Sequence, residues 1–332
     1  MSYEFLNGKC ILVTGGTGSF GQKFVRILLT ETKASRIIVF SRDELKQSQM
    51  QSTIADPEGR LRFFIGDVRD LDRLKRAFYG VEIVVHAAAL KQVPLLEYNP
   101  FEAVKTNILG TQNIIEAAID RDVKKVLLIS TDKAANPANL YGATKLCAER
   151  LIISGNFYCA NKTRFSAVRY GNVFGSRGSL IQIIEKYRST GRLNLTHADM
   201  TRFWITLDQG VSLVLMAIEK MDGGEIFVPK IPSMKIKELI TVLAPECNID
   251  IVGVRPGEKL HEVLITPEEA SHSKEYDTYY VILPEHSFGE TLKRRYADGK
   301  DLDRNFFYSS SSNTQWLSSD NLLELIENVH KN

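Results

Sequence analysis

The stretch VTGGTGSFGQKFV, residues 13–25, places three glycines between an apolar run and a segment with helical apolar spacing. Gly15 permits a sharp turn after a strand, and Gly18 lets the backbone approach a pyrophosphate group. Gly21 permits close packing of the following helix, whose first N–H groups point toward the anion. A glycine-rich turn is weak evidence when alone. A strand before it and a helix after it favour a dinucleotide-binding site.

The first half of the chain alternates short β-branched apolar runs with segments of helical periodicity, such as 20–31 and 107–120. Such apolar runs are typical of parallel strands that are buried on both faces. They occupy residues 9–16, 35–42, 61–67, 81–89, 123–131 and 164–172. The alternation predicts an α/β fold with a doubly wound parallel sheet of the Rossmann type.

The pattern becomes less regular from about residue 175. Helices separated by polar, glycine- and proline-containing loops are predicted at 178–191, 208–221 and 234–244. We therefore divide the chain into a Rossmann domain, 1–172, and a smaller, interwoven substrate-binding lobe, 173–332. Segments near 205–230, including an expected strand at 224–230, are predicted to return to the Rossmann domain.

The charge balance of the chain is nearly even. The 332 residues include 42 Lys and Arg against 40 Asp and Glu, a formal net charge of +2. This balance provides no bulk field for nucleic acid or an anionic membrane, and neither partner is expected. The chain shows no secretory signal pattern and no run near the roughly 18 apolar residues of a membrane span, which predicts a cytoplasmic protein. The four cysteines lack the paired spacing of zinc or redox motifs, so no metal site is expected.

The end of the second expected strand bears on the choice of nicotinamide cofactor. In VFSRDELK, residues 39–46, Ser41 is followed by Arg42 and, one helical turn later, by Lys46. A hydroxyl and two cations suit the extra ribose phosphate of NADP, which we expect in preference to NAD. A solvated helix start capped by Asp43 is the alternative. After the third strand, Asp67 and Val68 are expected to meet the adenine ring.

The segment STDKAANPANLYGATK, residues 130–145, contains the main catalytic candidates. Tyr141 and Lys145 are four residues apart, so on a helix they share one face. A lysine cation beside a phenol favours the phenolate, which can take a proton from a sugar hydroxyl while the nicotinamide takes the hydride. After a strand in a dinucleotide fold, this pair indicates a short-chain dehydrogenase/reductase.

The motifs TGGxGxxG, HAAALKQVP, NILGT and YxxxK together resemble the extended short-chain dehydrogenase/reductase superfamily over nearly the whole chain. Within it, STDKAANPANLYGATK, RYGNVFGSRGS, MTRFWIT, GGEIFVPKIPSMKI and RPGEKLHE resemble the configuration-inverting UDP-N-acetylglucosamine 4,6-dehydratases. Those enzymes open the pseudaminic acid pathway of bacterial surface polysaccharide synthesis and flagellin glycosylation. The resemblance implies UDP-N-acetylglucosamine as substrate and a homo-oligomer, with a hexamer as the candidate assembly.

The resemblance gives the triplet Thr131-Asp132-Lys133 a specific meaning, because retaining family members carry Thr-Asp-Glu there. It implies that Asp132 protonates the departing 6-hydroxyl group. A lysine made neutral by its surroundings could remove the carbon-5 proton, so Lys133 is the expected base. The expected product is UDP-2-acetamido-2,6-dideoxy-β-L-arabino-hexos-4-ulose. Without this context, Asp132 and Lys133 would be interpreted as a surface ion pair.

The resemblance also implies further binding residues. The cofactor set gains Thr17, Ser19, Phe20 and Ala87, and the substrate set comprises Lys91, Asn172, Arg177, Ser179, Thr196, Met200, Arg255 and Glu258. His86 is expected to be structural, and His261 has no assigned role. A retaining dehydratase, a UDP-sugar 4-epimerase and a non-catalytic NADP-binding scaffold remain alternatives. The Asp132–Lys133 pair argues against the epimerase, because epimerisation at carbon 4 needs no elimination.

Overall fold

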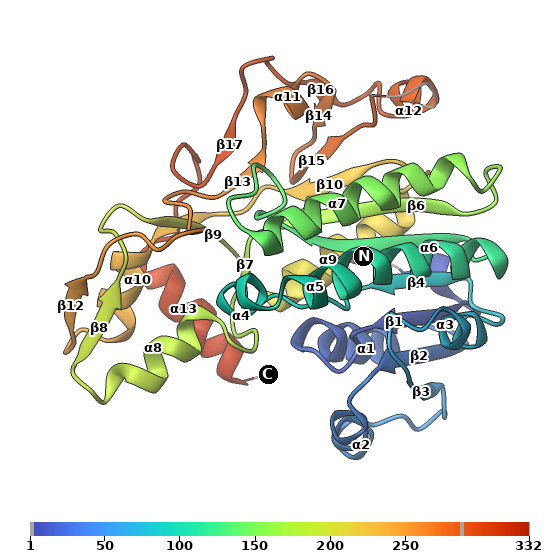
Figure 1. Ribbon diagram of the computed structural model, residues 1–332, viewed down its shortest axis with the longest axis horizontal. Helices are drawn as coiled ribbons and strands as arrows, with labels where there is room; N and C mark the ends of the chain where they lie inside the picture. The colour runs from blue at the N-terminus through green and yellow to red at the C-terminus, as the bar shows by residue number, and fades with distance from the viewer. Residues whose placement is uncertain (1–2, 286–288, 332) are drawn as a thin grey trace.

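The computed structural model describes residues 3–285 and 289–331. Its centre is a ten-stranded sheet with the order β16-β14-β15-β10-β6-β5-β4-β1-β2-β3 (Figure 1). Seven neighbouring strands are mutually parallel. From the outer edge inward they are β3 (Leu61–Ile65), β2 (Arg36–Ser41), β1 (Cys10–Thr14), β4 (Ile83–His86), β5 (Lys125–Thr131), β6 (Arg164–Tyr170) and β10 (Ile226–Pro229). The six parallel strands expected in the first half are confirmed.

Antiparallel strands extend the sheet beyond β10 and were not predicted from the sequence. They are β15 (Tyr279–Ile282), β14 (Ser273–Glu275) and β16 (Lys300–Asp301). Smaller sheets build the second lobe and the connections to it. They pair β7 (Asn172–Val173), β9 (Thr201–Ile205) and β11 (Ser233–Lys235); β8 (Arg192–Leu195) and β12 (Asn248–Ile251); and β13 (Val263–Ile265) and β17 (Tyr308–Ser309).

Helices cover both faces of the large sheet, as expected for a doubly wound fold. One layer contains α3, α6 and α7, and the other contains α1 and α9 (Figure 1). The α-helices are α1 (Ser19–Glu31), α2 (Glu44–Thr53), α3 (Leu71–Ala77), α4 (Val93–Tyr98), α5 (Pro100–Ala103), α6 (Gly110–Asp120), α7 (Leu140–Ser154), α8 (Leu180–Arg188), α9 (Leu207–Lys220), α10 (Ile236–Leu243), α11 (Pro267–Ala270), α12 (Gly289–Arg295) and α13 (Ser319–Lys331). Two 3₁₀ turns are η1 (Glu4–Leu6) and η3 (Gly155–Phe157), and η2 (Val104–Leu109) is a π-helical segment between α5 and α6.

Local chemistry explains where several of these helices begin. Short polar side chains accept a backbone N–H at the start of a helix, which satisfies a donor that has no partner within the helix. Asp43 caps α2, Asp70 caps α3 and Asn139 caps α7 in this way. Thr206 and Gln209 form a reciprocal capping box at the start of α9.

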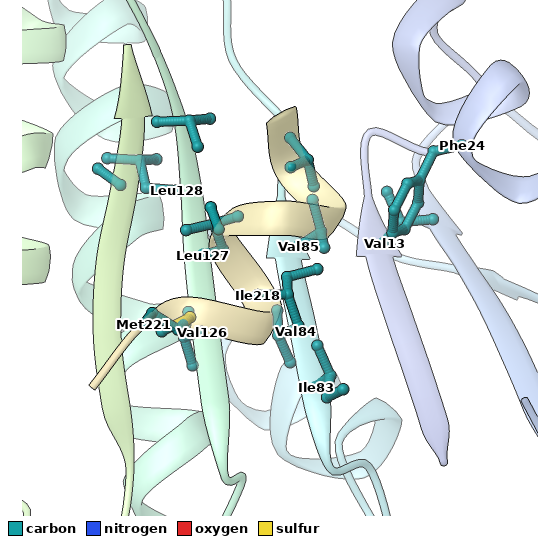
Figure 2. Packing of buried hydrophobic residues seen from close by; sticks show 14 of the residues in the cluster. Val13, Phe24, Ile83, Val84, Val85, Val126, Leu127, Leu128, Ile218 and Met221 are labelled. Carbon is teal, nitrogen blue, oxygen red and sulfur yellow. The ribbon is translucent and has the colours of Figure 1, made fainter. Parts of the chain in front are cut away.

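The main core lies between the sheet and its helices, and a second core lies in the smaller lobe. Figure 2 shows Ile218 and Met221 of the α9 region packed over apolar residues of β4 and β5. Trp204, Phe174 and Met234 are among the residues of the second core. The helix α9 and the strand β10, both within 205–230, join the main body. Residues 279–283 also pack into the main core, so the C-terminal half contributes to both cores.

The strand order positions the site. The chain runs outward from β1 through β2 to β3 and then crosses to β4 on the other side of β1. In open α/β sheets, ligands bind outside the carboxyl ends of the strands at such a switch point. The loops after β1 and β4 therefore flank the expected crevice. Within the described part of the chain, no helix has both the length and the apolar character needed to cross a bilayer.

Candidate active site

A cavity of about 680 Å³ lies at the carboxyl ends of the parallel strands. Its walls come from the loops after β1, β2, β3, β4 and β5, from α7, and from the segment that follows β6. Arg202, Trp204 and Leu207 add a wall from the second half of the chain. The cavity thus joins the glycine-rich turn to the Tyr141–Lys145 helix in one continuous space.

The glycine-rich turn leaves no room for side chains at its first and third glycines. Gly15 has φ +65°, and a Cβ atom there would lie 2.9 Å from the backbone of Ala88. A Cβ on Gly21 would lie 2.4 Å from the Cα of Gly16, so the helix packs against the turn as closely as predicted for the third glycine. No side chain caps the N-terminus of α1, so its first N–H groups remain suited to an anion. This cradle fits a dinucleotide pyrophosphate.

Two buried hydroxyl groups in the cavity wall also point to a ligand. Ser130 Oγ and Thr106 Oγ1 are buried without a hydrogen-bond partner among the described residues. Buried polar atoms are normally paired, so such exceptions indicate a missing partner. A ligand with polar groups in this part of the cavity would supply that partner.

The groups expected to meet the adenosine end already have partners. Arg42 Nη1 lies 3.4 Å from Asp67 Oδ2, and Lys46 Nζ lies 2.6 Å from Asp43 Oδ2. Asp43 also caps α2, as the alternative interpretation of this segment expected. The hydroxyl group of Ser41 accepts a hydrogen bond from Gln47 Nε2 at 3.0 Å. A ribose phosphate would have to compete with two carboxylates for these cations.

The predicted catalytic pair, Tyr141 and Lys145 on α7, lies on the cavity wall, as the helical spacing predicted. Lys145 Nζ donates to the carbonyl of Ile129 at 2.8 Å, and burial lowers the pKa of Lys145 to about 8. Burial raises the pKa of Tyr141 to about 12, although the Lys133 cation opposes this shift. The pKa of Tyr141 thus moves opposite to the direction expected from a neighbouring cation, because burial outweighs the effect of the cation.

Asp132 and Lys133 form an ion pair beside Tyr141, not on the outer surface of the protein. Lys133 Nζ lies 3.0 Å from Asp132 Oδ1, and Asp132 is fully buried. Thr131 Oγ1 donates to the same carboxylate oxygen at 2.8 Å. Burial raises the pKa of Asp132, although Lys133 opposes the shift.

The protonation of Lys133 differs from the expected neutral amine. Burial alone would lower the pKa of Lys133, but the carboxylates of Asp132 and Glu262 outweigh it and raise the pKa above its ordinary value. These two carboxylates favour the ammonium form of Lys133. Its use as a base requires a step in which it gives up that proton.

Sequence reasoning missed three charged residues near Lys133. Glu262 Oε1 lies 3.3 Å from Lys133 Nζ and 3.5 Å from Arg202 Nε. Lys259 Nζ lies 3.6 Å from Glu262 Oε2. Glu262 and Lys259 belong to RPGEKLHE and Arg202 to MTRFWIT, both quoted as family motifs, but no spacing rule connects them to Lys133. Only the folded chain brings them together.

Every predicted cofactor-binding residue lines the cavity: Gly15, Thr17, Gly18, Ser19, Phe20, Gly21, Ser41, Arg42, Lys46, Asp67, Val68, Ala87, Tyr141 and Lys145. Among the predicted substrate-binding residues, the cavity wall includes Lys91, Asn172, Arg177 and Ser179. Lys91 is exposed on this wall, and partial desolvation together with the neighbouring Lys133 cation lowers its pKa. The predicted catalytic residues Thr131 and Lys133 also line the wall, with Asp132 buried behind them.

The other predicted substrate-binding residues are not part of the cavity wall. Thr196 and Met200 are buried, and the Thr196 hydroxyl group donates to Met200 Sδ at 3.3 Å. Met200 packs within the second core. Arg255 is exposed, and its Nη1 lies 3.8 Å from Glu258 Oε1. The substrate contacts implied for these four residues remain predictions.

His86 lies behind the site, in the structural position expected for it. It is buried between Thr14 Oγ1, 2.7 Å from its Nδ1, and Thr111 Oγ1, 3.2 Å from its Nε2. Burial lowers the pKa of His86 to about 3, so the ring is neutral at physiological pH.

The glycine-rich turn, the strand order and the Tyr141–Lys145 pair together define the class as a short-chain dehydrogenase/reductase.

Known relatives agree with that class. Residues 11–284 match the family model described as "Polysaccharide biosynthesis protein". The chain is 48% identical over 331 residues to a UDP-N-acetylglucosamine 4,6-dehydratase (inverting) of Campylobacter jejuni, covering 97% of this chain and 98% of the relative. It is 41% identical over 285 residues to a UDP-glucose 4-epimerase of Rickettsia canadensis, covering 82% of each. The chain therefore belongs to this polysaccharide biosynthesis family of extended short-chain dehydrogenases/reductases.

Solved structures agree on the fold. The protein Pen from Bacillus thuringiensis superposes with a TM-score of 0.90 at 37% identity, covering 98% of this chain and 99% of Pen. A dTDP-glucose 4,6-dehydratase of Streptomyces venezuelae, whose structure contains bound NAD, superposes with a TM-score of 0.70 at 22% identity, covering 97% of each chain. Structural neighbours of this chain thus bind a nicotinamide dinucleotide.

Proposed function

We propose that this protein is an NADP-dependent UDP-N-acetylglucosamine 4,6-dehydratase that inverts carbon 5. The observation that carries the proposal is the Asp132–Lys133 ion pair, 3.0 Å long, beside Tyr141 at the same cavity as the glycine-rich turn. Oxidation alone needs Tyr141 and Lys145, whereas removal of water also needs an acid and a base. The 48% identical relative from C. jejuni, named for this reaction, supports the choice of substrate.

The cofactor site is built by the backbone around Gly15 and Gly18 and by the first turn of α1. Arg42 and Lys46 would face the ribose phosphate of NADP, once that phosphate replaces their carboxylate partners. NADP bound there would accept a hydride from carbon 4 of the sugar and return it to carbon 6. The hydride is returned within one turnover, so no external reductant is consumed.

Tyr141 removes the proton of the 4-hydroxyl group in the first step. Its phenol needs a positive environment to act as a base, because burial holds its pKa at about 12 in the ligand-free protein. Lys145, on the same face of α7, supplies a cation whose own pKa is near 8. We expect Lys145 to orient the cofactor ribose and to stabilise the phenolate once a ligand excludes water.

Asp132 and Lys133 then carry out the elimination. Transfer of one proton from the Lys133 ammonium to the Asp132 carboxylate, across their 3.0 Å contact, converts the ion pair into a neutral amine and a carboxylic acid. The N–H bond breaks, the O–H bond forms, and no other reactant is needed. The amine is then able to take the carbon-5 proton, and the acid to protonate the leaving 6-hydroxyl group.

Inversion completes the proposal. The carbonyl at carbon 4 acidifies the carbon-5 proton, which passes to Lys133. Carbon 5 then takes a proton on the opposite face, balanced by the one that Tyr141 took from the 4-hydroxyl group, and the product is UDP-2-acetamido-2,6-dideoxy-β-L-arabino-hexos-4-ulose. A 4-epimerase is the second candidate, favoured by the 41% identity to a relative named UDP-glucose 4-epimerase. An epimerase would return the hydride to carbon 4 and would have no use for an acid–base pair at carbons 5 and 6.

NMR analysis of the product formed in heavy water tests this proposal. We expect a 4-keto-6-deoxy sugar with one deuterium at carbon 5 and the ring couplings of the L-arabino configuration at early time points. A primary product of D-xylo configuration would contradict inversion at carbon 5 but would still support the assignment as a dehydratase. A product that keeps its 6-hydroxyl group would favour the epimerase.

A further inference from the structure

Lys133 lies between two carboxylates, and only one of them belongs to its own loop. Asp132 Oδ1 is 3.0 Å from Lys133 Nζ, and Glu262 Oε1 is 3.3 Å from the same nitrogen. Glu262 is only 2% exposed and comes from the segment just before β13, far along the chain. The proposed elimination uses Asp132 and Lys133 and assigns no role to Glu262.

Hydrogen bonds on both sides of Glu262 fix its backbone beside the loop of Lys133. Its backbone N–H donates to Ser310 Oγ at 2.9 Å, and its carbonyl accepts from the N–H of Ser310 at 2.8 Å. Lys259 Nζ donates to the carbonyl of Ala135 at 2.6 Å, which ties the Glu262 segment to the loop of Lys133. Glu262 Oε2 is buried without a hydrogen-bond partner among the described residues.

We propose that Glu262 is a positioning residue for Lys133: it holds Nζ beside Asp132 and keeps the proton on the lysine until substrate is bound. This inference rests on the proposed dehydratase function. A buried carboxylate at this distance stabilises the ammonium form of the lysine. The negative charge of Glu262 also disfavours the charged form of Asp132, so Glu262 acts on both members of the pair.

The charges around Lys133 give the direction of the effect. The groups that face it from the packed elements are Asp132, Glu262, Arg202, Lys91, Lys259 and Tyr141. The negative charge of Glu262 raises the pKa of Lys133 and also raises the pKa of Asp132. Removing that charge therefore makes both groups lose their protons at lower pH. If Glu262 contributed only packing, its substitution would not shift these two pKa values in this way.

The test compares three variants of the full-length enzyme. Glu262→Gln keeps the shape and removes the charge, and Glu262→Asp keeps the charge but withdraws it by one methylene. Glu275→Gln is the matched control, because Glu275 loses the same charge at a contact with Lys230 that does not involve the cavity. Each enzyme receives UDP-N-acetylglucosamine in a single turnover, and the rate of water loss is followed as a function of pH.

We expect both limbs of the pH–rate profile to move to lower pH in Glu262→Gln, by about one to three units, as for an opposite charge lost at this distance. Glu262→Asp should show a smaller shift of the pH–rate profile in the same direction. If Glu262→Gln does not fold, the shift in Glu262→Asp tests the proposal in its place. Limbs that stay in place in Glu262→Gln or in a folded Glu262→Asp would overturn the inference, as would an equal shift in Glu275→Gln. Failure of the wild-type enzyme to form a 4-keto-6-deoxy sugar would instead reject the proposed function.

Discussion

Asp132 is the residue whose substitution separates oxidation from elimination. It is fully buried behind the cavity wall, and its Oδ2 has no hydrogen-bond partner among the described residues. Asp132→Asn removes the proton donor but keeps the shape. We expect the sugar to be oxidised, as seen by reduced-nicotinamide absorbance, while water loss slows by about 100- to 10,000-fold. Normal turnover would show that another group is the acid.

Tyr141→Phe should stop the reaction one step earlier. Without the phenol, no group in position takes the proton of the 4-hydroxyl group, so reduced-nicotinamide absorbance should not appear in a single turnover. Tyr158→Phe is a suitable control, because Tyr158 is 76% exposed and does not line the cavity. Accumulation of the oxidised sugar in Tyr141→Phe would contradict the role assigned to Tyr141.

Arg42 tests the choice of cofactor. Arg42→Ala should weaken the binding of NADP far more than that of NAD, because only NADP offers the extra phosphate. A hydrogen bond between charged groups contributes roughly 1.5 to 3 kcal/mol. Titration of both cofactors into this variant and into Arg192→Ala, which removes an arginine paired with Asp250 outside the cavity, measures the difference. Equal losses for NADP and NAD would remove the basis for preferring NADP.

Among individual residues, those whose role follows from local spacing were predictable. The glycines of the turn and the Tyr141–Lys145 pair are each set by a few neighbouring positions, and the structure brings all of them to one cavity. Glu262 was not predictable from local spacing, because its contact with Lys133 depends on how distant segments fold together. The effect of Glu262 on the pKa of Lys133 was not predictable for the same reason.

At the scale of the elements, the start of α1 depends on a glycine that tolerates no side chain. A Cβ on Gly21 would lie 2.4 Å from Gly16, so Gly21→Ala should lower the free energy of unfolding by about 1–3 kcal/mol and impair cofactor binding. Gly210→Ala, in α9, is the matched control: apart from the adjacent residues and the backbone of the same helix, no described atom lies within 4 Å of the added methyl group. That change should stabilise by about 0.5–1 kcal/mol. Equal effects in denaturant unfolding would contradict the packing argument.

The parallel strands were predictable because they are apolar on both faces and are separated by amphipathic helices. The antiparallel strands β14 and β16 carry no such pattern. They are two or three residues long and rich in charged side chains, as SKE and KD show. Their place in the sheet depends on pairing with β15, which short-range periodicity does not reveal.

At the scale of the whole molecule, a buried ionic cluster joins the two halves of the chain. Arg169 of β6 donates to Glu149 of α7 at 2.6 Å and to Glu269 of α11 at 2.8 Å, and all three are buried. Arg169→Met leaves two buried carboxylates without their cationic partner, which should cost about 3–5 kcal/mol of stability in chemical denaturation. Arg192→Met, at an exposed ion pair, should change stability little. A small effect at Arg169 would show that water reaches the cluster.

The oligomeric state and the cytoplasmic location remain predictions. Large apolar side chains on α4 and α5 are exposed in the single chain, with Leu95 at 64%, Tyr98 at 87% and Phe101 at 77%. Exposed apolar groups of this size often mark an interface. Light scattering should give a multiple of the 37.4 kDa chain mass. A monomer at micromolar concentration would contradict the expected homo-oligomer.

The central claim, that the enzyme removes water across carbons 5 and 6 while a hydride moves from carbon 4 to carbon 6, is tested most directly by following that hydride. The enzyme is given UDP-N-acetylglucosamine with deuterium at carbon 4, and the product is analysed by NMR. We predict that the deuterium appears in the carbon-6 methyl group, because the hydride taken from carbon 4 enters the position opened by water loss. Deuterium returned to carbon 4, on a sugar that keeps its 6-hydroxyl group, would contradict the claim.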